Sequence, residues 1–137
     1  MLASLQIATF TYFAIRISTS DILLRTIRNI DLGYFLTASL IVNNEKLRGT
    51  SFVGALGVVM VCLFLHFAFR GKIGIGDLKL FIAMGAWAPD FLTWFHNFGF
   101  SWSLGGIFAV IQFLARRKQS TSIPFAPFIF LGFFSSI

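Results

Sequence analysis

The sequence is poor in charge and rich in apolar residues. Only 12% of its 137 residues are charged, against roughly a quarter in soluble domains. Hydrophobic residues make up 57% of the chain, and 19 residues are phenylalanine. The mean hydropathy is +0.84. A soluble domain would have to show much of this apolar surface to water. The composition therefore predicts an all-α, polytopic membrane protein that forms a single domain.

Cysteine is nearly absent. The one cysteine, Cys62, lies inside an apolar run and is expected to pack as a small core residue. A single cysteine allows no intramolecular disulfide and no four-cysteine zinc site. No combination of histidine, cysteine and acidic residues has the spacing of metal ligands, so neither a metal nor another cofactor is expected.

Acidic residues are scarcer than basic ones, five against eleven, and the formal net charge is +6. A basic balance can indicate nucleic-acid binding. Here the basic residues lie in short groups between apolar runs, which membrane topology explains better. No nucleic-acid partner is expected.

Six apolar segments are predicted to enter or cross a membrane: residues 2–18, 31–42, 50–69, 78–95, 102–115 and a last segment from 124. From Pro124 the sequence has fourteen residues. As a helix they would extend about 21 Å, less than a hydrocarbon core of roughly 30 Å. This last segment is expected to lie tucked among the others. Trp94, His96 and Trp102 are interpreted as interfacial residues beside the break between the fourth and fifth segments.

A polar stretch at residues 71–80, GKIGIGDLKL, separates two apolar runs. Ionisable groups at membrane depth are expensive, and they persist where they face a protein interior or a water-filled cavity. Asp77 is such a group, and Gly74 and Gly76 let the backbone pass close to it. The plain alternative is that Asp77 caps the next helix while Lys79 lies among lipid headgroups.

This stretch resembles the Gly-x-Gly-Asp motif of intramembrane aspartic proteases, and most of all that of the type IV prepilin peptidases. Asp21, with Arg25 four residues on and Asn29 eight residues on, is similar to the family's first-aspartate motif, an Asp, a basic residue and Ile-Pro-Asn. Arg28 stands where the family usually has proline. Residues 123–128, IPFAPF, resemble the start of the family's last helix.

The resemblance implies an aspartic endopeptidase that cleaves the leader peptide of prepilins or pilin-like proteins. Its catalytic residues would be Asp21 and Asp77. Supporting or substrate-binding roles would fall to Arg25, Asn29, Gly74, Gly76, Lys79, Pro124 and Phe125. Larger members carry a cytoplasmic insertion with paired Cys-x-x-Cys motifs and also N-methylate the product. One cysteine and a short first connection indicate the peptidase-only form, with no methyltransferase or zinc insertion. The partners implied are the substrate and the lipid bilayer. The formation of a homo-oligomer is left open.

The other acidic residues need weighing against this assignment. Asp31 lies ten residues after Asp21 and is an alternative partner, although as the first acid of a helix it is interpreted as a cap. Asp90, after Pro89, is interpreted as marking a kink or the outer end of the fourth segment. Glu45 is interpreted as an ordinary loop charge.

The basic residues predict the orientation. If both aspartate loops share one side, that side holds nine basic residues, and the other side holds Lys46 and Arg48, which together account for all eleven. Arg16 is among the nine and is expected to extend to the interface. The positive-inside bias then places the site at the cytoplasmic face of the inner (plasma) membrane, with both termini outside.

Two other classes stay open. One is a membrane assembly factor that has the fold without the activity, and Arg28 in place of proline is its support. The other is a small transporter or channel subunit with Asp77 in a polar pathway. For a peptidase, the loop at 71–76 and the turn at 124–127 are expected to form the two walls that hold an extended substrate.

Overall fold

The computed structural model describes residues 2–44, 52–70, 73–115 and 123–137. Within these ranges the chain is all-helical, with six α-helices, one short 3₁₀ helix and no strand. The elements are α1 (Leu2–Leu24), α2 (Asn29–Val42), α4 (Phe52–Ala68), α5 (Ile75–Met84), α6 (Phe91–Ala115), α7 (Ala126–Phe133) and η1 (Phe134–Ser136).

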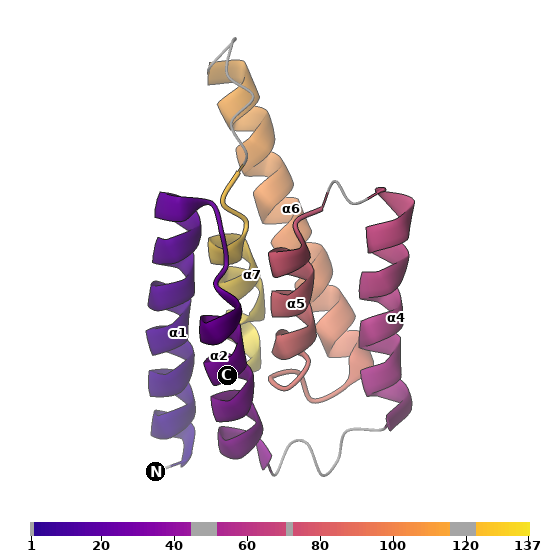
Figure 1. Cartoon of the computed structure of the whole chain (residues 1–137). Helices are drawn as coiled ribbons and strands as arrows, with labels where there is room; N and C mark the ends of the chain where they lie inside the picture. The colour runs from indigo at the N-terminus through magenta and orange to yellow at the C-terminus, as the bar shows by residue number, and fades with distance from the viewer. Residues whose placement is uncertain (1, 45–51, 71–72, 116–122) are drawn as a thin grey trace.

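Successive helices run in alternating directions through one bundle (Figure 1). The connection from α1 to α2, the start of α5, the start of α7 and the end of α6 all lie at the same end of the bundle. The amino terminus lies at the opposite end, and α6 projects beyond the other helices at the first end. Polar residues at several helix ends are therefore gathered at one end of the molecule.

The core forms around α7. Ala126, Ile129, Phe130 and Phe133 of this helix are buried, and α7 packs against α1, α5 and α6. Phe10 of α1 lies edge-on to the Phe130 ring, with 5.3 Å between ring centroids. Such edge-to-face pairs add to the apolar burial itself. The expectation that the last segment is tucked among the others is confirmed.

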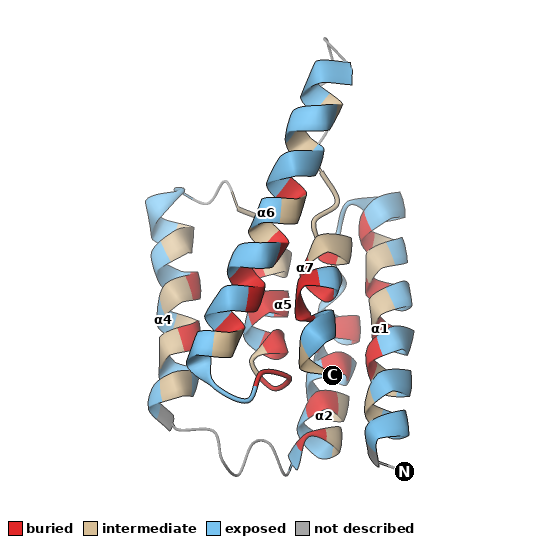
Figure 2. Cartoon of the chain, turned by 180° about the vertical axis from the view of Figure 1, so that it is seen from behind, coloured by how far each residue is buried: buried red, intermediate tan, exposed pale blue. Residues whose placement is uncertain are grey.

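The outward faces of the helices carry many large apolar side chains, and the buried residues lie on the faces turned inward (Figure 2). Two helices are long and apolar enough to cross a membrane, over Ala3–Leu24 and Phe91–Ala115. At 1.5 Å per residue both exceed a hydrocarbon core of roughly 30 Å. The shorter apolar helices cover Asn29–Val42, Val53–Ala68 and Ala126–Ser136.

The first segment is longer than the sequence predicted. The prediction ended it at residue 18, whereas α1 continues to Leu24. Arg16 lies inside this helix, where its guanidinium binds an aspartate of α2, as described below. Thr19 also lies inside the helix, and its Oγ1 donates to the Ile15 carbonyl one turn back, at 2.6 Å.

The boundary between the fourth and fifth segments was also predicted wrongly. The helix that starts near Asp77 ends at Met84, and residues 85–90 form turns before α6 begins at Phe91. Asp90 caps α6, because the Thr93 N–H donates to its Oδ1 at 2.8 Å. Trp94, His96 and Trp102 therefore lie inside the 25-residue α6 and do not flank a break. Asp90 was interpreted as a kink or the outer end of the fourth segment, whereas it stands at the start of α6, six residues after α5 ends.

Candidate active site

Asp21 lies in the last turns of α1 on the face that packs into the core. Phe13, Ile17 and Asp21 follow one another at four-residue spacing, so one stripe of the helix carries all three into the interior. Asp21 is only 6% exposed. Its Oδ2 accepts a hydrogen bond from the Ala126 backbone N–H at 2.9 Å. A buried carboxylate with this partner is held in one orientation.

The donor is the first residue of α7. The N–H groups in the first turn of a helix have no partner inside the helix, and they favour negative charge. Pro127, next in the chain, has no N–H, so Ala126 is the donor that this turn offers. Sequence reasoning missed Ala126, although the small residue between Pro124 and Pro127 was the available signal.

Phe125 and Pro124 directly precede α7, and their expected role in holding substrate stays a prediction. The Phe125 ring packs among Phe81, Trp102 and Phe128, with centroid distances of 6.0–6.2 Å. A Cβ added to Gly105 of α6 would overlap this ring. Pro124 is half-buried just before α7. The turn therefore anchors the start of α7 in the core, and neither residue lines the cavity described below.

Asp77 lies in the first turn of α5 and is half-buried. Gly74 is the residue just before this helix, and its carbonyl accepts the Leu78 N–H at 3.2 Å. A Cβ added to Gly74 would stand 2.9 Å from Asp77 Oδ2, closer than real Cβ atoms come. The missing side chain at Gly74 therefore leaves the space that the Asp77 carboxylate occupies.

Gly76 has a different role. A Cβ there would meet the Ile27 side chain at 3.1 Å, which is tighter than most real contacts. Gly76 thus lets the start of α5 approach the connection between α1 and α2. This approach brings the elements that carry the two aspartates together.

The two aspartates line one cavity of about 550 Å³. Its other described walls are Arg25, Thr26, Ile27, Gly74, Ile75, Gly76 and Ile123. Asp77 precedes the apolar segment that starts at Leu78 and faces this cavity. Burial, and secondarily the charge of Asp21, raise the pKa of Asp77 to about 7. The structure therefore brings Asp21 and Asp77 into one electrostatically coupled site.

The supporting residues divide into two places. Arg25 lines the cavity and has a left-handed backbone, with φ 55°, at the end of α1. Lys79 and Asn29 lie beside the cavity, where the Lys79 Nζ donates to Asn29 Oδ1 at 3.0 Å and joins α5 to α2. The structure thus groups these three residues around the aspartates, with only Arg25 on the cavity wall.

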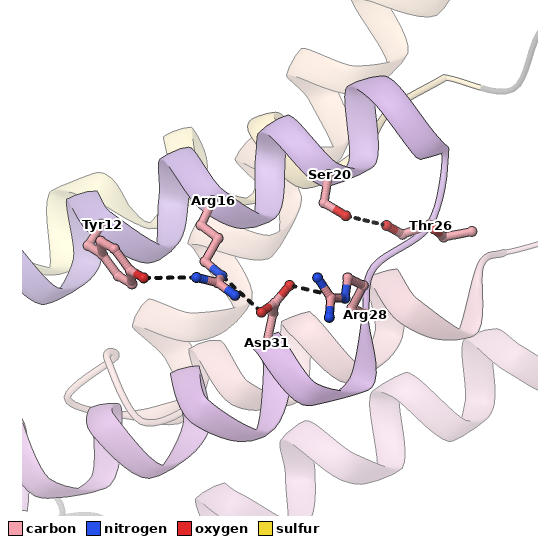
Figure 3. Close-up of polar contacts among 6 residues, drawn as sticks. All are labelled: Tyr12, Arg16, Ser20, Thr26, Arg28 and Asp31. Carbon is pink, nitrogen blue, oxygen red and sulfur yellow. Dashed lines mark hydrogen bonds and ion pairs between the residues drawn. The ribbon is translucent and has the colours of Figure 1, made fainter.

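Asp31 is neither the partner of Asp77 nor a helix cap. Arg16 of α1 donates from Nε to its Oδ1 at 2.9 Å, and the Arg28 Nε lies 3.9 Å from its Oδ2 (Figure 3). The residue before α2, Arg28, makes no side-chain capping bond. The interpretation of Asp31 as a cap is therefore wrong, because two guanidinium groups bind its carboxylate.

A second cavity, of about 330 Å³, opens between α2 and α5. Asn29 and Lys79 lie on its wall, followed by Leu32, Gly33, Leu36, Ile82 and Ala83. Leu36 and Ile82 also line an apolar cavity of about 200 Å³ between α2, α4, α5 and α6. An apolar surface therefore leads away from the Asn29–Lys79 pair toward the opposite end of the bundle.

Comparison with known proteins adds one finding. A family model described as the type IV leader peptidase family matches residues 8–111. The matched range includes Asp21 and Asp77 and ends before the segment at 123–128. No curated protein and no solved structure gives a significant match.

Proposed function

The chain belongs to the type IV leader peptidase family, and we propose that it is an aspartic endopeptidase that uses Asp21 and Asp77. The observation that carries this proposal is the shared cavity, in which carboxylates from two different helices interact. Two carboxylates in one site can divide the acid and base tasks of peptide hydrolysis.

In the proposed reaction, one carboxylate takes a proton from water as the water oxygen attacks the scissile carbonyl. The other carboxylate carries a proton and donates a hydrogen bond to the carbonyl oxygen, and the roles then reverse to release the amine. Two nearby carboxylates do not easily both ionise, so the pair holds one proton at working pH. The pair titrates as a unit.

The surroundings favour one placement of that proton. The Ala126 N–H donates to Asp21 Oδ2 and so holds the Asp21 carboxylate in one orientation toward the cavity. Burial and the neighbouring charge favour the neutral form of Asp77. We therefore assign Asp21 the role of base and Asp77 the role of acid in the first step.

The proposed substrate is the leader region of a pilin-like protein, cut without methylation of the new amino terminus. Only residues 25–28 separate α1 from α2, and the sequence has a single cysteine. An apolar segment of the substrate would lie along the cavity of about 330 Å³ between α2 and α5, because this cavity begins at the edge of the site. Lys79 and Asn29 would mark its entrance.

The proposed setting is a multi-pass arrangement in the inner membrane. Its support is the apolar outward surface and the two helices that are long enough to cross. The site would face the cytoplasm, since the sequence assigns most of its basic residues to the end of the bundle that carries the site.

The test is cleavage of a pilin-like precursor by the purified protein in detergent or lipid nanodiscs. Parent protein is expected to release the leader, whereas Asp21→Asn and Asp77→Asn abolish release and remain folded. Asp90→Asn is the matched control for the loss of a carboxylate, because Asp90 caps α6 outside the cavity of the two aspartates and asparagine also caps helices well. Equal cleavage by parent and Asp77→Asn would exclude the aspartic mechanism. No cleavage by a folded parent would favour the inactive assembly factor or the transport role.

A further inference from the structure

A polar network joins α1 to α2 beside the proposed site, and the reaction proposed above does not use it. Its centre is the Asp31 carboxylate, whose side chain is 3% exposed. Arg16 Nε binds it at 2.9 Å, and Arg16 Nη1 also donates to Tyr12 Oη at 3.0 Å. Figure 3 shows these groups in line between the two helices. A buried carboxylate with a guanidinium partner holds a defined geometry.

A second contact lies one turn further along α1. Ser20 Oγ donates to the Thr26 carbonyl at 3.1 Å and so binds the connection that follows the helix (Figure 3). Tyr12, Arg16 and Ser20 recur every four residues and therefore share one face of α1. That face carries the contacts to α2 and to the connection.

Asp21 lies on the neighbouring face of the same helix. Successive residues of an α-helix are about 100° apart around the axis, so Ser20 and Asp21 are related by a fixed rotation. Rotating or sliding α1 to break the contacts of Arg16 and Ser20 would also move Asp21. A shift of one residue along the axis is about 1.5 Å. The network therefore determines where the Asp21 carboxylate stands.

Asp21 must meet two groups from other parts of the fold. One is the Ala126 N–H of α7, at 2.9 Å, and the other is Asp77 of α5 across the cavity. Neither α7 nor α5 takes part in the network around Asp31. The network thus holds α1 through contacts to α2 and the connection, separately from the partners that Asp21 must reach on α5 and α7.

The connection itself requires such support. Arg25 has φ 55°, a conformation that residues other than glycine seldom adopt and that surrounding contacts must maintain. Its N–H is bonded to the Asp21 carbonyl at 3.0 Å, so the turn begins on the aspartate itself. At the other end of the connection, Arg28 is held near Asp31.

We infer that Asp31, acting through Arg16 and Arg28, is a positioning residue that sets the place of Asp21 in the site. The inference rests on the proposed function for its effect on catalysis. Asp31 touches neither the cavity nor the proposed substrate surface, so it does not react. Loss of the Asp31 charge leaves Arg16 without a counter-ion and allows α1 to rotate.

The test compares Asp31→Asn and Ser20→Ala with the parent and with Asp90→Asn. Small misplacements of reacting groups can cost on the order of a hundredfold in rate. We expect Asp31→Asn to lower kcat about tenfold or more with KM nearly unchanged. Ser20→Ala removes only one hydrogen bond and is expected to lower kcat by a few-fold, with little change in Tm. Asp90→Asn is expected to match the parent.

A second measurement separates positioning from stability. The protonation of Asp77 can be followed by the infrared carboxyl band that disappears in Asp77→Asn. The described charged groups around Asp77 are Asp21 from α1, Arg25 from the connection and Lys79 on α5 itself. If Asp21 moves away, its charge no longer raises the pKa of Asp77, and that pKa falls in Asp31→Asn. The double variant Asp31→Asn, Arg16→Gln replaces the ion pair with a neutral hydrogen-bonded pair. It is expected to recover part of the kcat that the single variant Asp31→Asn loses.

The outcomes are distinct. Parent kcat and an unchanged Asp77 titration in folded Asp31→Asn would overturn the inference. A lower Tm with an unchanged titration would reduce the network to a stabilising contact and would overturn it too. If Asp31→Asn does not fold, Ser20→Ala decides in the same way. If the parent cleaves nothing, the proposed function fails, and a shifted Asp77 titration in the variants would still support the positioning of Asp21.

Discussion

At the scale of single residues, the protonation of Asp77 makes a pH prediction. The folded pKa is raised to about 7 from an ordinary value of 3.8. Between these values the folded state holds a proton that the unfolded state has lost. Its contribution to stability is complete below the unfolded pKa and is lost as pH rises through the folded pKa. We expect the thermal stability of the parent to fall relative to Asp77→Asn between pH 5 and pH 8.

The control for this prediction is Asp90→Asn. Hydrogen bonds from the Thr93 backbone are the main cause that lowers the pKa of Asp90, so its contribution is lost only as pH falls below the ordinary carboxyl range. The difference in Tm between parent and Asp90→Asn should therefore stay constant from pH 5 to pH 8. Melting curves of the parent and Asp77→Asn that stay parallel over this range would contradict the raised pKa.

Gly74 makes a second prediction at this scale. Its backbone φ of −57° suits any residue, so the need for glycine is the space above the Asp77 carboxylate. Gly74→Ala is expected to displace that carboxylate and to lower kcat on the order of tenfold to a hundredfold. The measurement is single-turnover cleavage, with Gly106→Ala as control because a Cβ there meets nothing within 4 Å. Parent rates in Gly74→Ala would show that the close contact does not matter.

At the scale of helices, the sequence predicted which helices form better than it predicted where each helix begins and ends. The apolar runs correctly gave the end of α2 at Val42 and most of α4. The end of α1 was wrong because the helix continues through the polar residues Thr19, Ser20 and Asp21, whose hydrogen bonds an apolar pattern does not show. The break at 85–90 was missed because Ala86, Trp87 and Ala88 are apolar and buried, as they would be in a continuous helix, so the apolar run does not show where the helix stops.

The candidate site likewise contains residues that the sequence predicted and residues that it did not. Motif spacing predicted Asp21 and Asp77, whose shared cavity the structure shows, while their catalytic roles stay a prediction. The role of Ala126 is carried by its backbone, and side-chain patterns do not reveal which backbone N–H meets a carboxylate. Residues 71 and 72, two of the six residues of one expected substrate wall, lie outside the described residues, as do Glu45, Lys46 and Arg48.

The surface between α2 and α5 makes a prediction at the scale of elements. A Cβ at Gly33 meets nothing within 4 Å, and Gly33 lines the cavity below Lys79. Gly33→Leu should fill part of this surface and raise KM several-fold with kcat nearly unchanged, which is the pattern of lost ground-state binding. Stability should not fall, because leucine is a good helix former, whereas glycine is roughly 0.8–1.0 kcal/mol less favourable than alanine inside a helix.

The matched control is Gly99→Leu on α6, where a Cβ also meets nothing within 4 Å and no cavity with Lys79 is lined. Steady-state cleavage measures both variants. An unchanged KM in Gly33→Leu would place the apolar part of the substrate elsewhere on the bundle.

At the scale of the whole molecule, charge is distributed unevenly between the two ends. Arg25, Arg28 and Arg70 lie at the ends of helices on the side of the two aspartates. Arg16 no longer belongs to this group, because it lies within α1 and pairs with Asp31. Of the nine basic residues first assigned to that side, eight remain, and two are assigned to the other side. The asymmetry survives the correction, so the expected orientation is unchanged.

Orientation can be measured with single cysteines. Cys62 is 2% exposed and would first be replaced by alanine. Asn44 lies just beyond the end of α2, at the end of the bundle opposite to the aspartates. Ala115 ends α6 at the end of the aspartates, and both residues are exposed. A membrane-impermeant maleimide added to intact cells is expected to label Asn44→Cys and to label Ala115→Cys only after permeabilisation. Labelling of Ala115→Cys alone in intact cells would place the aspartates on the outer side, where a cytoplasmic leader could not reach them.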